Sequence, residues 1–274
     1  MNDLRTVEKR VLGRSHGPIT RVISPGDLGD LLKPFVFLDF IHANIPDGFG
    51  FEYHPHSGIA TLTYQRNVDV HYVDTEGKEG ILKAGGLEWM QSGGGAWHQG
   101  SMPKGGLVTA FQLWVALPPG VEDGPSRSEY VAPDKVPDID GVRVLLGEYS
   151  GTKSSIITPS PMNYFDVAIK SGTRWRFEID RLHSQAWAFV YEGKADVCGA
   201  TSSHELLILS ALGHAIEVVA HEDARMIFGS GANHPFPLIT GPSSVHTNKT
   251  SLAKGEAKIM AIGERLKREG KLDS

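Results

Sequence analysis

The sequence predicts an all-β protein made of two similar units, followed by one helix. Short segments alternate apolar and polar residues, as in FQLWVAL at 111–117 and WAFVY at 187–191, which is typical of strands with one buried face. The 274 residues include 32 glycines and 16 prolines, which supply turns between such strands. Two separate segments also recur at one constant spacing, which indicates a duplicated unit. Short strands with glycine-rich turns favour a sandwich or a barrel.

The repeat has an offset of 127 residues. It aligns YQRNVDV at 64–70 with YEGKADV at 191–197, and ILKAGG at 81–86 with ILSALG at 208–213. Because two segments keep one register, composition alone does not explain the match. A repeated unit of roughly 120 residues also lies within the usual size range of a domain.

A stretch rich in proline, glycine and charge, residues 118–138, is typical of a linker. We therefore expect one domain over residues 1–125 and a second over residues 126–250. The remaining tail, residues 251–274, departs from the β pattern.

In this tail, apolar residues recur at helical spacing, and Ser251 can cap the start of the helix. Basic side chains near its end would face the negative end of the helix dipole. The residues of the apolar stripe are Leu252, Ile259, Ile262 and Leu266. We expect a C-terminal packing helix and assign it no function.

Charge and composition exclude several kinds of partner. A net charge of −5 and an isoelectric point near 6.2 disfavour direct binding to nucleic acid or to an anionic membrane. One cysteine, Cys198, permits no intrachain disulfide and leaves nitrogen and oxygen as metal ligands. No apolar run approaches 18 residues and the first residues lack a secretory signal, so we expect a cytoplasmic protein.

The segment YHPHSG at 53–58 is the first candidate for chemistry. Alternate side chains of a strand share a face, so His54 and His56 would point the same way. Pro55 favours extended backbone and suits an edge strand. A third histidine, His98, follows three consecutive glycines in SGGGAWHQGS, and a barrel could bring its strand beside the first pair. Three neutral imidazoles suit Fe, Mn, Ni, Cu or Zn.

These segments together resemble the pirin family, which belongs to the cupin superfamily. The resemblance covers about residues 20–270, and the pair HPH and WMQSGGGAWH is specific in combination. It implies two tandem cupin barrels (double-stranded β-helix, or jelly-roll, folds) with a C-terminal helix. It further implies a mononuclear non-haem iron, Fe(II), in the N-terminal barrel, with His54, His56 and His98 at three ligand positions.

The chain departs from the family pattern where pirins carry carboxylates. Gly100 stands where the family has its glutamate ligand, and Ser57 and Ala60 stand where it has an arginine and a second glutamate. Three histidines alone would leave a bound divalent ion with a charge of +2 and no adjacent base. For the fourth position we consider Gln99, Glu52 and His42, of which Glu52 is the best placed because it shares a strand face with His54.

The repeat also predicts which unit binds metal. At the offset of 127, the three histidines correspond to Arg181, His183 and Arg225. Two permanent cations would repel a metal ion, so we expect a site in the N-terminal unit alone.

The resemblance implies two kinds of function. The first is a metal-dependent dioxygenase, similar to a quercetin 2,3-dioxygenase, acting on a small aromatic, oxygen-rich substrate. The alternative is a non-enzymatic protein whose metal or redox state controls a protein partner. A metal-free barrel kept for packing is a third hypothesis, and metal measurement separates it from the other two.

Overall fold

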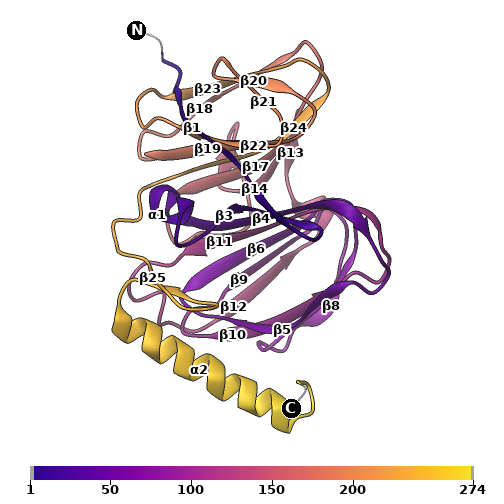
Figure 1. Cartoon of the computed structure of the whole chain (residues 1–274), viewed down its shortest axis with the longest axis vertical. Helices are drawn as coiled ribbons and strands as arrows, with labels where there is room; N and C mark the ends of the chain where they lie inside the picture. The colour runs from indigo at the N-terminus through magenta and orange to yellow at the C-terminus, as the bar shows by residue number, and fades with distance from the viewer. Residues whose placement is uncertain (1–2, 273–274) are drawn as a thin grey trace. The chain divides into compact units, whose positions relative to one another are not determined.

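The computed structural model describes residues 3–272, which are mostly β-strands. The described chain divides into two compact units. We call residues 15–135 with 234–272 the first barrel, and residues 3–14 with 136–233 the second barrel. Both are drawn in Figure 1. No helix among the described residues is both long enough and apolar enough to cross a membrane.

These units differ from the expected boundaries at both ends of the chain. Residues 3–14 belong to the second barrel because β1 (Val7–Leu12) pairs with β22 (Glu205–Leu209). Residues 234–272 belong to the first barrel, and the linker is divided between the two units. Each unit is thus completed by a segment distant in sequence, which a division into consecutive domains misses.

The first barrel consists of a seven-stranded sheet and a four-stranded sheet. In spatial order the larger sheet contains β12 (Arg127–Val131), β9 (Leu87–Gln91), β6 (Ile59–Gln65), β11 (Gly106–Ala116), β4 (Phe35–Ile45), β3 (Ile19–Ile23) and β2 (Arg14–His16). The smaller sheet contains β5 (Gly50–His56), β10 (Ala96–Ser101), β7 (Val70–Asp74) and β8 (Glu79–Leu82). The short elements are α1 (Leu28–Leu32), the 3-10 turn Pro133–Lys135, β25 (Ile239–Thr240) and β26 (Val245–His246).

The second barrel repeats this arrangement. Its larger sheet contains β1, β22, β19 (Gln185–Glu192), β24 (Ala224–Gly231), β17 (Met162–Ile169), β14 (Val142–Leu146) and β13 (Asp138–Ile139). Its smaller sheet contains β18 (Arg174–Glu178), β23 (Ala215–Ala220), β20 (Ala195–Val197) and β21 (Ala200–Ser202). A two-stranded hairpin of β15 (Glu148–Tyr149) and β16 (Thr152–Lys153) completes it.

The strand orders show how far the sequence repeat holds. Tyr64 on β6 and Tyr191 on β19 occupy the same place in their sheets, as the offset predicts. The match of 81–86 with 208–213 fails, because β8 is in a smaller sheet and β22 is in a larger one. Loops of different length between the strands change the offset along the chain.

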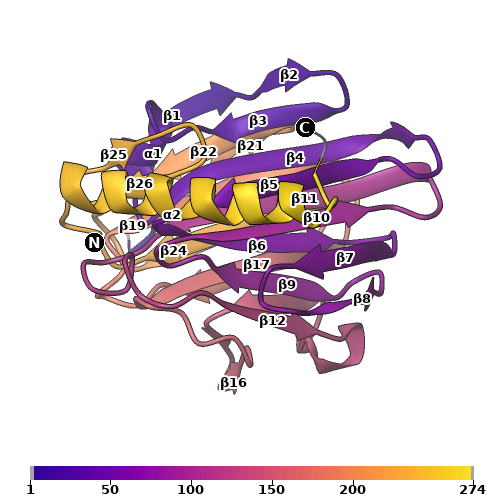
Figure 2. The same cartoon turned by 90° about the horizontal axis from the view of Figure 1, so that it is seen from below.

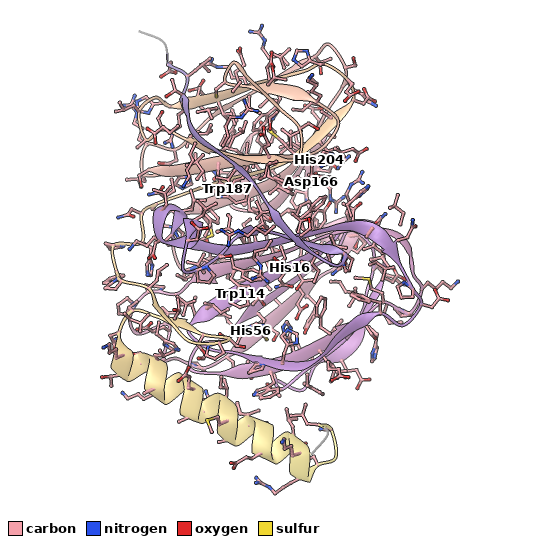
Figure 3. All side chains as sticks on the ribbon, viewed as in Figure 1. His16, His56, Trp114, Asp166, Trp187 and His204 are labelled. Atoms are coloured by element: carbon pink, nitrogen blue, oxygen red, sulfur yellow. The ribbon has the colours of Figure 1, made fainter. Side chains whose placement is uncertain are left out.

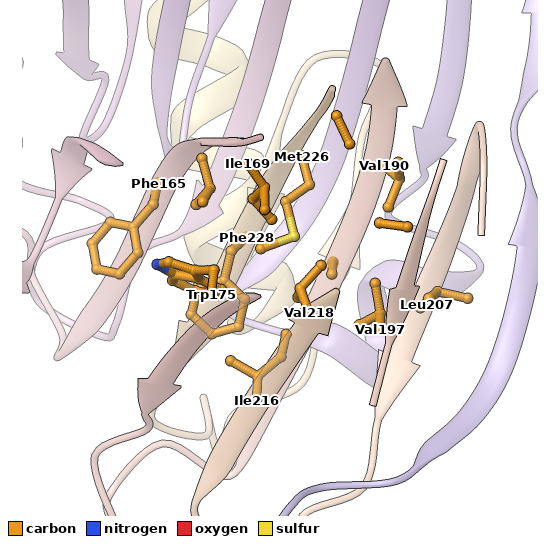
Figure 4. Close-up of a cluster of buried hydrophobic side chains, with 14 of the residues drawn as sticks. Phe165, Ile169, Trp175, Val190, Val197, Leu207, Ile216, Val218, Met226 and Phe228 are labelled. Carbon is orange, nitrogen blue, oxygen red and sulfur yellow. The ribbon is translucent and has the colours of Figure 1, made fainter. Parts of the chain in front are cut away.

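The second barrel has a densely packed apolar core. Figure 4 shows Phe165, Trp175 and Phe228 packed together with aliphatic side chains from both sheets. The ring centroids of Trp175 and Phe228 lie 5.8 Å apart, and those of Phe165 and Phe228 lie 5.9 Å apart. Burial of such rings makes this core a main source of stability.

The expected C-terminal helix is present as α2 (Lys249–Arg268), which lies across β5 and β10 of the first barrel (Figure 2). It therefore packs on the first barrel, and Asn248, rather than Ser251, caps it by accepting a hydrogen bond from the Ser251 amide at 2.9 Å. Its buried face carries Gly255, which approaches the end of the β5 strand closely. On the same face, the indole of Trp97 donates a 2.8 Å hydrogen bond to a helix carbonyl.

Candidate metal centre

Three histidines converge inside the first barrel from two neighbouring strands. His54 and His56 lie on β5, one residue apart, and His98 lies on β10 directly opposite His54. β5 is the edge strand of its sheet, which accommodates Pro55 as expected. The ring centroids of His54 and His98 are 4.4 Å apart, and that of His56 lies 5.1 Å and 5.2 Å from them. One nitrogen from each ring lies within 4.8 Å of the others, so the three could hold a metal ion.

Hydrogen bonds fix the orientation of each ring. Nδ1 of His54 donates to the carbonyl of Glu52 at 2.7 Å, and Nδ1 of His98 donates to the carboxylate of Glu88 at 2.8 Å. The ring of His56 is hydrogen-bonded to the carbonyl of Ser243. Each ring thus has one nitrogen anchored away from its neighbours.

The other nitrogens fit a metal. Nδ1 of His56 and Nε2 of His98 are buried without a hydrogen-bond partner, which is costly for a polar atom unless a ligand satisfies it. Burial, together with the neighbouring His98, lowers the pKa of His54 to about 4. Burial also lowers the pKa of His56 well below its ordinary value. Both rings are therefore neutral near pH 7, which leaves their lone pairs free for a metal.

A cavity of about 270 Å³ lies beside the histidines, between the two sheets of the first barrel. Its walls include Phe37, Trp114, Phe111 and Met102. Trp114 stacks on Phe37 with centroids 4.1 Å apart and meets the edge of the His56 ring at 5.0 Å. Figure 3 shows His56 and Trp114 inside this barrel. The cavity can thus take a small, largely apolar molecule next to the three nitrogens.

Glu88 was missed by the sequence reasoning, which considered Glu52 as the carboxylate near the site. It lies on β9, is 5% exposed and lines the cavity. Burial alone would raise the pKa of Glu88, but His98 and the hydroxyl of Thr63 together outweigh burial and lower it. A glutamate within the buried strand LEWMQ was the available signal.

The suggested fourth ligands have different outcomes. Glu52 is exposed and contributes its backbone carbonyl to His54, while its carboxylate is not part of the histidine group. His42 is exposed and hydrogen-bonded to Thr109 at 3.0 Å, outside the cavity lining. Gln99 lines the cavity and stays a candidate. The side chains of Glu52 and His42 are therefore not part of the histidine group.

The counterparts predicted by the offset of 127 are also corrected. Arg181 and His183 lie in the loop between β18 and β19, and Arg225 lies on β24 of the larger sheet. By strand order, β18 and β23 correspond to the histidine-bearing strands β5 and β10. Among residues 3–272, the three histidines form the one group of three or more His, Cys, Asp or Glu side chains that could hold a metal.

A buried polar cluster closes the end of β5. Ser57 lies 3.0 Å from Nε2 of His246 and donates a 2.8 Å hydrogen bond to Ser244. The carboxylate of Glu122 accepts hydrogen bonds from the amide and hydroxyl of Thr247. Ser57, His246 and Glu122 are almost fully buried, and Gly255 of α2 packs against Ser57 and His246. The cluster therefore serves to fasten residues 243–247, including the carbonyl that orients His56, to the strand.

Two tandem cupin barrels, the first with three converging histidines, define a protein of the cupin class. The chain belongs to the pirin family. The family model for pirin matches residues 18–115, which contain all three histidines. A pirin-like protein of Arabidopsis thaliana is 32% identical over 243 residues, which cover 79% of this chain and 75% of that protein.

Solved structures agree with this assignment. A structure titled quercetin 2,3-dioxygenase from Acinetobacter baumannii superposes with a TM-score of 0.86 and 25% identity, covering 96% of this chain and 98% of that one. A bacterial pirin from Escherichia coli in complex with nickel(II) gives a TM-score of 0.64 at 20% identity, covering 83% and 97%. The second likeness supports the fold.

Proposed function

We propose that the first barrel binds one divalent metal ion through Nε2 of His54, Nδ1 of His56 and Nε2 of His98, and acts as a dioxygenase on a small aromatic, oxygen-rich substrate. The observation that carries this proposal is the position of unpartnered imidazole nitrogens at a cavity with aromatic walls. We favour Fe(II), while Zn, Mn, Ni and Cu also suit three imidazoles. The nickel(II) complex of the Escherichia coli pirin supports a divalent ion in this fold.

The side chains around the cavity would hold the substrate and exclude water, beside the chemistry of the metal. When bound, the metal would supply a Lewis-acidic, redox-active centre for oxygen and substrate. Phe37 and Trp114, already stacked on each other, offer flat apolar surfaces that can hold an aromatic ring and exclude water. Phe51 lines the cavity and is 46% exposed, so the cavity reaches the surface near this side chain.

The cavity also bears on the alternative function. A metal- or redox-controlled binding protein would present its site as a closed surface to a protein partner. Here the space beside the histidines is a cavity of about 270 Å³ with largely apolar walls and a few polar groups, which suits a small molecule. We therefore favour an enzyme over a regulatory protein.

The first experiment measures metal in untagged protein purified without chelators, and oxygen uptake after anaerobic loading with Fe(II). Quercetin is the probe substrate. We expect about one metal ion per chain and oxygen uptake that requires both metal and quercetin. Protein that takes up no divalent ion contradicts the metal site, whereas metal without turnover of quercetin contradicts this substrate.

A further inference from the structure

The floor of the cavity carries one row of polar side chains. Register places Glu88, Thr63, Gln112, Asp39 and Arg21 opposite one another on five successive strands, β9, β6, β11, β4 and β3. All five line the cavity. The row runs from the histidines, where Glu88 contacts His98, to an ion pair between Arg21 and Asp39. Glu88 is thus held by a cross-sheet polar row in an otherwise apolar wall.

The position of Glu88 is unusual for a carboxylate that only stabilises a fold. It is almost fully buried, and a buried ion pair gains little over an apolar pair of similar size. Its oxygen lies 2.8 Å from Nδ1 of His98, whose Nε2 is the buried, unpartnered nitrogen facing the other rings. The carboxylate of Glu88 therefore holds one nitrogen of the His98 ring and leaves the other without a partner. In metal sites, a carboxylate in this position orients a histidine ligand.

The strand that carries His98 provides no carboxylate of its own. Gly100 lies two residues further along β10, on the same face as His98, and lines the cavity without a side chain. Ala60 lies on β6 and is fully buried. Glu88 is the buried carboxylate that contacts a ring of the histidine group.

We propose that Glu88 supplies the negative charge of this metal site through His98, without touching the ion. This inference rests on the proposed function and names a positioning residue for it. Glu88 keeps the proton of His98 on Nδ1 and the lone pair of Nε2 toward the ion. One carboxylate also reduces the charge of the ion and its surroundings from +2 to +1. The space at Gly100 then stays open for substrate or oxygen.

The test compares Co(II) binding by wild-type protein, Glu88→Gln and the control Glu264→Gln. Both substitutions remove one carboxylate, but that of Glu264 is exposed on α2 and not part of the histidine group. Competition with a chromogenic chelator should show Glu88→Gln binding Co(II) about 10–100-fold more weakly, with a changed visible spectrum of the bound ion. Glu264→Gln should bind within about twofold of wild type, because solvent screens an exposed charge.

A rescue separates charge at the site from a structural effect. An added Cβ at Gly100 would lie 3.3 Å from Val70, which a small shift of that side chain accommodates. The double variant Glu88→Gln/Gly100→Glu should therefore regain tight Co(II) binding through a direct carboxylate ligand. If the glutamate at position 100 does not restore the Co(II) affinity lost in Glu88→Gln, the proposal that Glu88 supplies the negative charge of the site is wrong.

Other outcomes are equally decisive. If Glu88→Gln folds and binds Co(II) like Glu264→Gln, the inference is wrong while the proposed metal site stands. Wild-type protein that binds no Co(II) would instead remove the proposed function. Should Glu88→Gln fail to fold, Glu88→Asp replaces it, since the shorter side chain withdraws the carboxylate from Nδ1 by about one bond length, ~1.5 Å. Unchanged affinity in that variant also overturns the inference.

Discussion

The two barrels share one strand order and differ in what fills them. On β5 and β10 the facing pair is His54 and His98, whereas on the corresponding β18 and β23 the pairs include Phe177 with Ile216. Aromatic and aliphatic side chains form a buried apolar cluster in the second barrel. In the first, polar side chains and Gly100 leave a cavity beside the histidines.

This difference shows that the fold alone does not create the site. A cupin interior packed with large apolar side chains gains stability and loses space for a ligand. The first barrel instead keeps buried nitrogens without partners, at a cost in stability, in the position where a metal can satisfy them. The following predictions test this division between a stabilising barrel and a metal-binding barrel.

The largest effect should come from emptying the core of the second barrel. Phe228 is fully buried against Trp175 and Phe165, so Phe228→Ala should lower the free energy of unfolding by about 3–5 kcal/mol. Phe51→Ala, at the exposed edge of the cavity in the first barrel, should lower the free energy of unfolding much less. Urea unfolding of both variants checks this, and Co(II) binding by the folded fraction should be unchanged in Phe228→Ala. Equal costs would contradict the comparison.

The next effect concerns metal alone. His98→Ala removes one of three nitrogens and should weaken Co(II) binding by more than about 100-fold, or about 2.7 kcal/mol. His183→Ala is the matched control, because His183 is also buried but belongs to the second barrel, where it is hydrogen-bonded to Ser230 at 3.0 Å. Its metal affinity should equal that of wild type. Chelator competition measures both, and metal loss in His183→Ala would argue against a site confined to the first barrel.

Much of this division was predictable from sequence. Alternation and turns predicted the β fold, and the helical stripe predicted α2, because both signals are local. The spacing of His54 and His56 predicted one shared face for the same reason. His98 needed the further assumption that a later strand lies beside β5, which the structure shows.

The remaining features depend on tertiary contacts that no local sequence pattern specifies. Glu88 reaches His98 across the barrel interior, from the larger sheet to the smaller one, and nothing in LEWMQ specifies this partner. The pairing of β1 with β22 and the packing of α2 on β10 join segments that lie far apart in the sequence. The offset of 127 failed at the histidines because unequal loops shift the register between corresponding strands.

Acid should destabilise the metal-free first barrel. The pKa of His54 is about 4 in the folded state and near 6.5 when unfolded, so between these values the unfolded chain binds a proton that the folded chain does not. Stability therefore falls as pH drops from about 6.5 to 4, with His54 contributing about 2 kcal/mol after allowance for its partial exposure.

Urea unfolding at pH 7 and pH 4.5 measures this contribution, and His54→Gln should reduce the difference between the two conditions. His234 is the matched control, because burial also lowers its pKa to about 4 and it is not part of the histidine group. His234→Gln should reduce the pH dependence similarly but leave Co(II) binding intact. A pH dependence that survives in His54→Gln at full size contradicts the assignment.

The smallest effect should come from the helix that covers the site. Gly to Ala within a helix ordinarily stabilises by about 1 kcal/mol. At Gly255 an added Cβ would lie 2.5 Å from Oγ of Ser57 and 2.6 Å from Nε2 of His246, so overpacking should reverse the sign. We expect Gly255→Ala to lose about 1–2 kcal/mol.

Gly255→Ala should also weaken Co(II) binding severalfold, because the displaced segment 243–247 carries the carbonyl bound to His56. Ala261→Gly, on the exposed face of the same helix, makes the opposite change and should cost about 1 kcal/mol through propensity alone. Its metal affinity should match wild type. Urea unfolding measures the stability of both variants, and chelator competition measures their Co(II) affinity. Weaker Co(II) binding in both variants would show that metal binding depends on helix stability. Weaker binding in Gly255→Ala alone would assign the effect to the packing that orients His56.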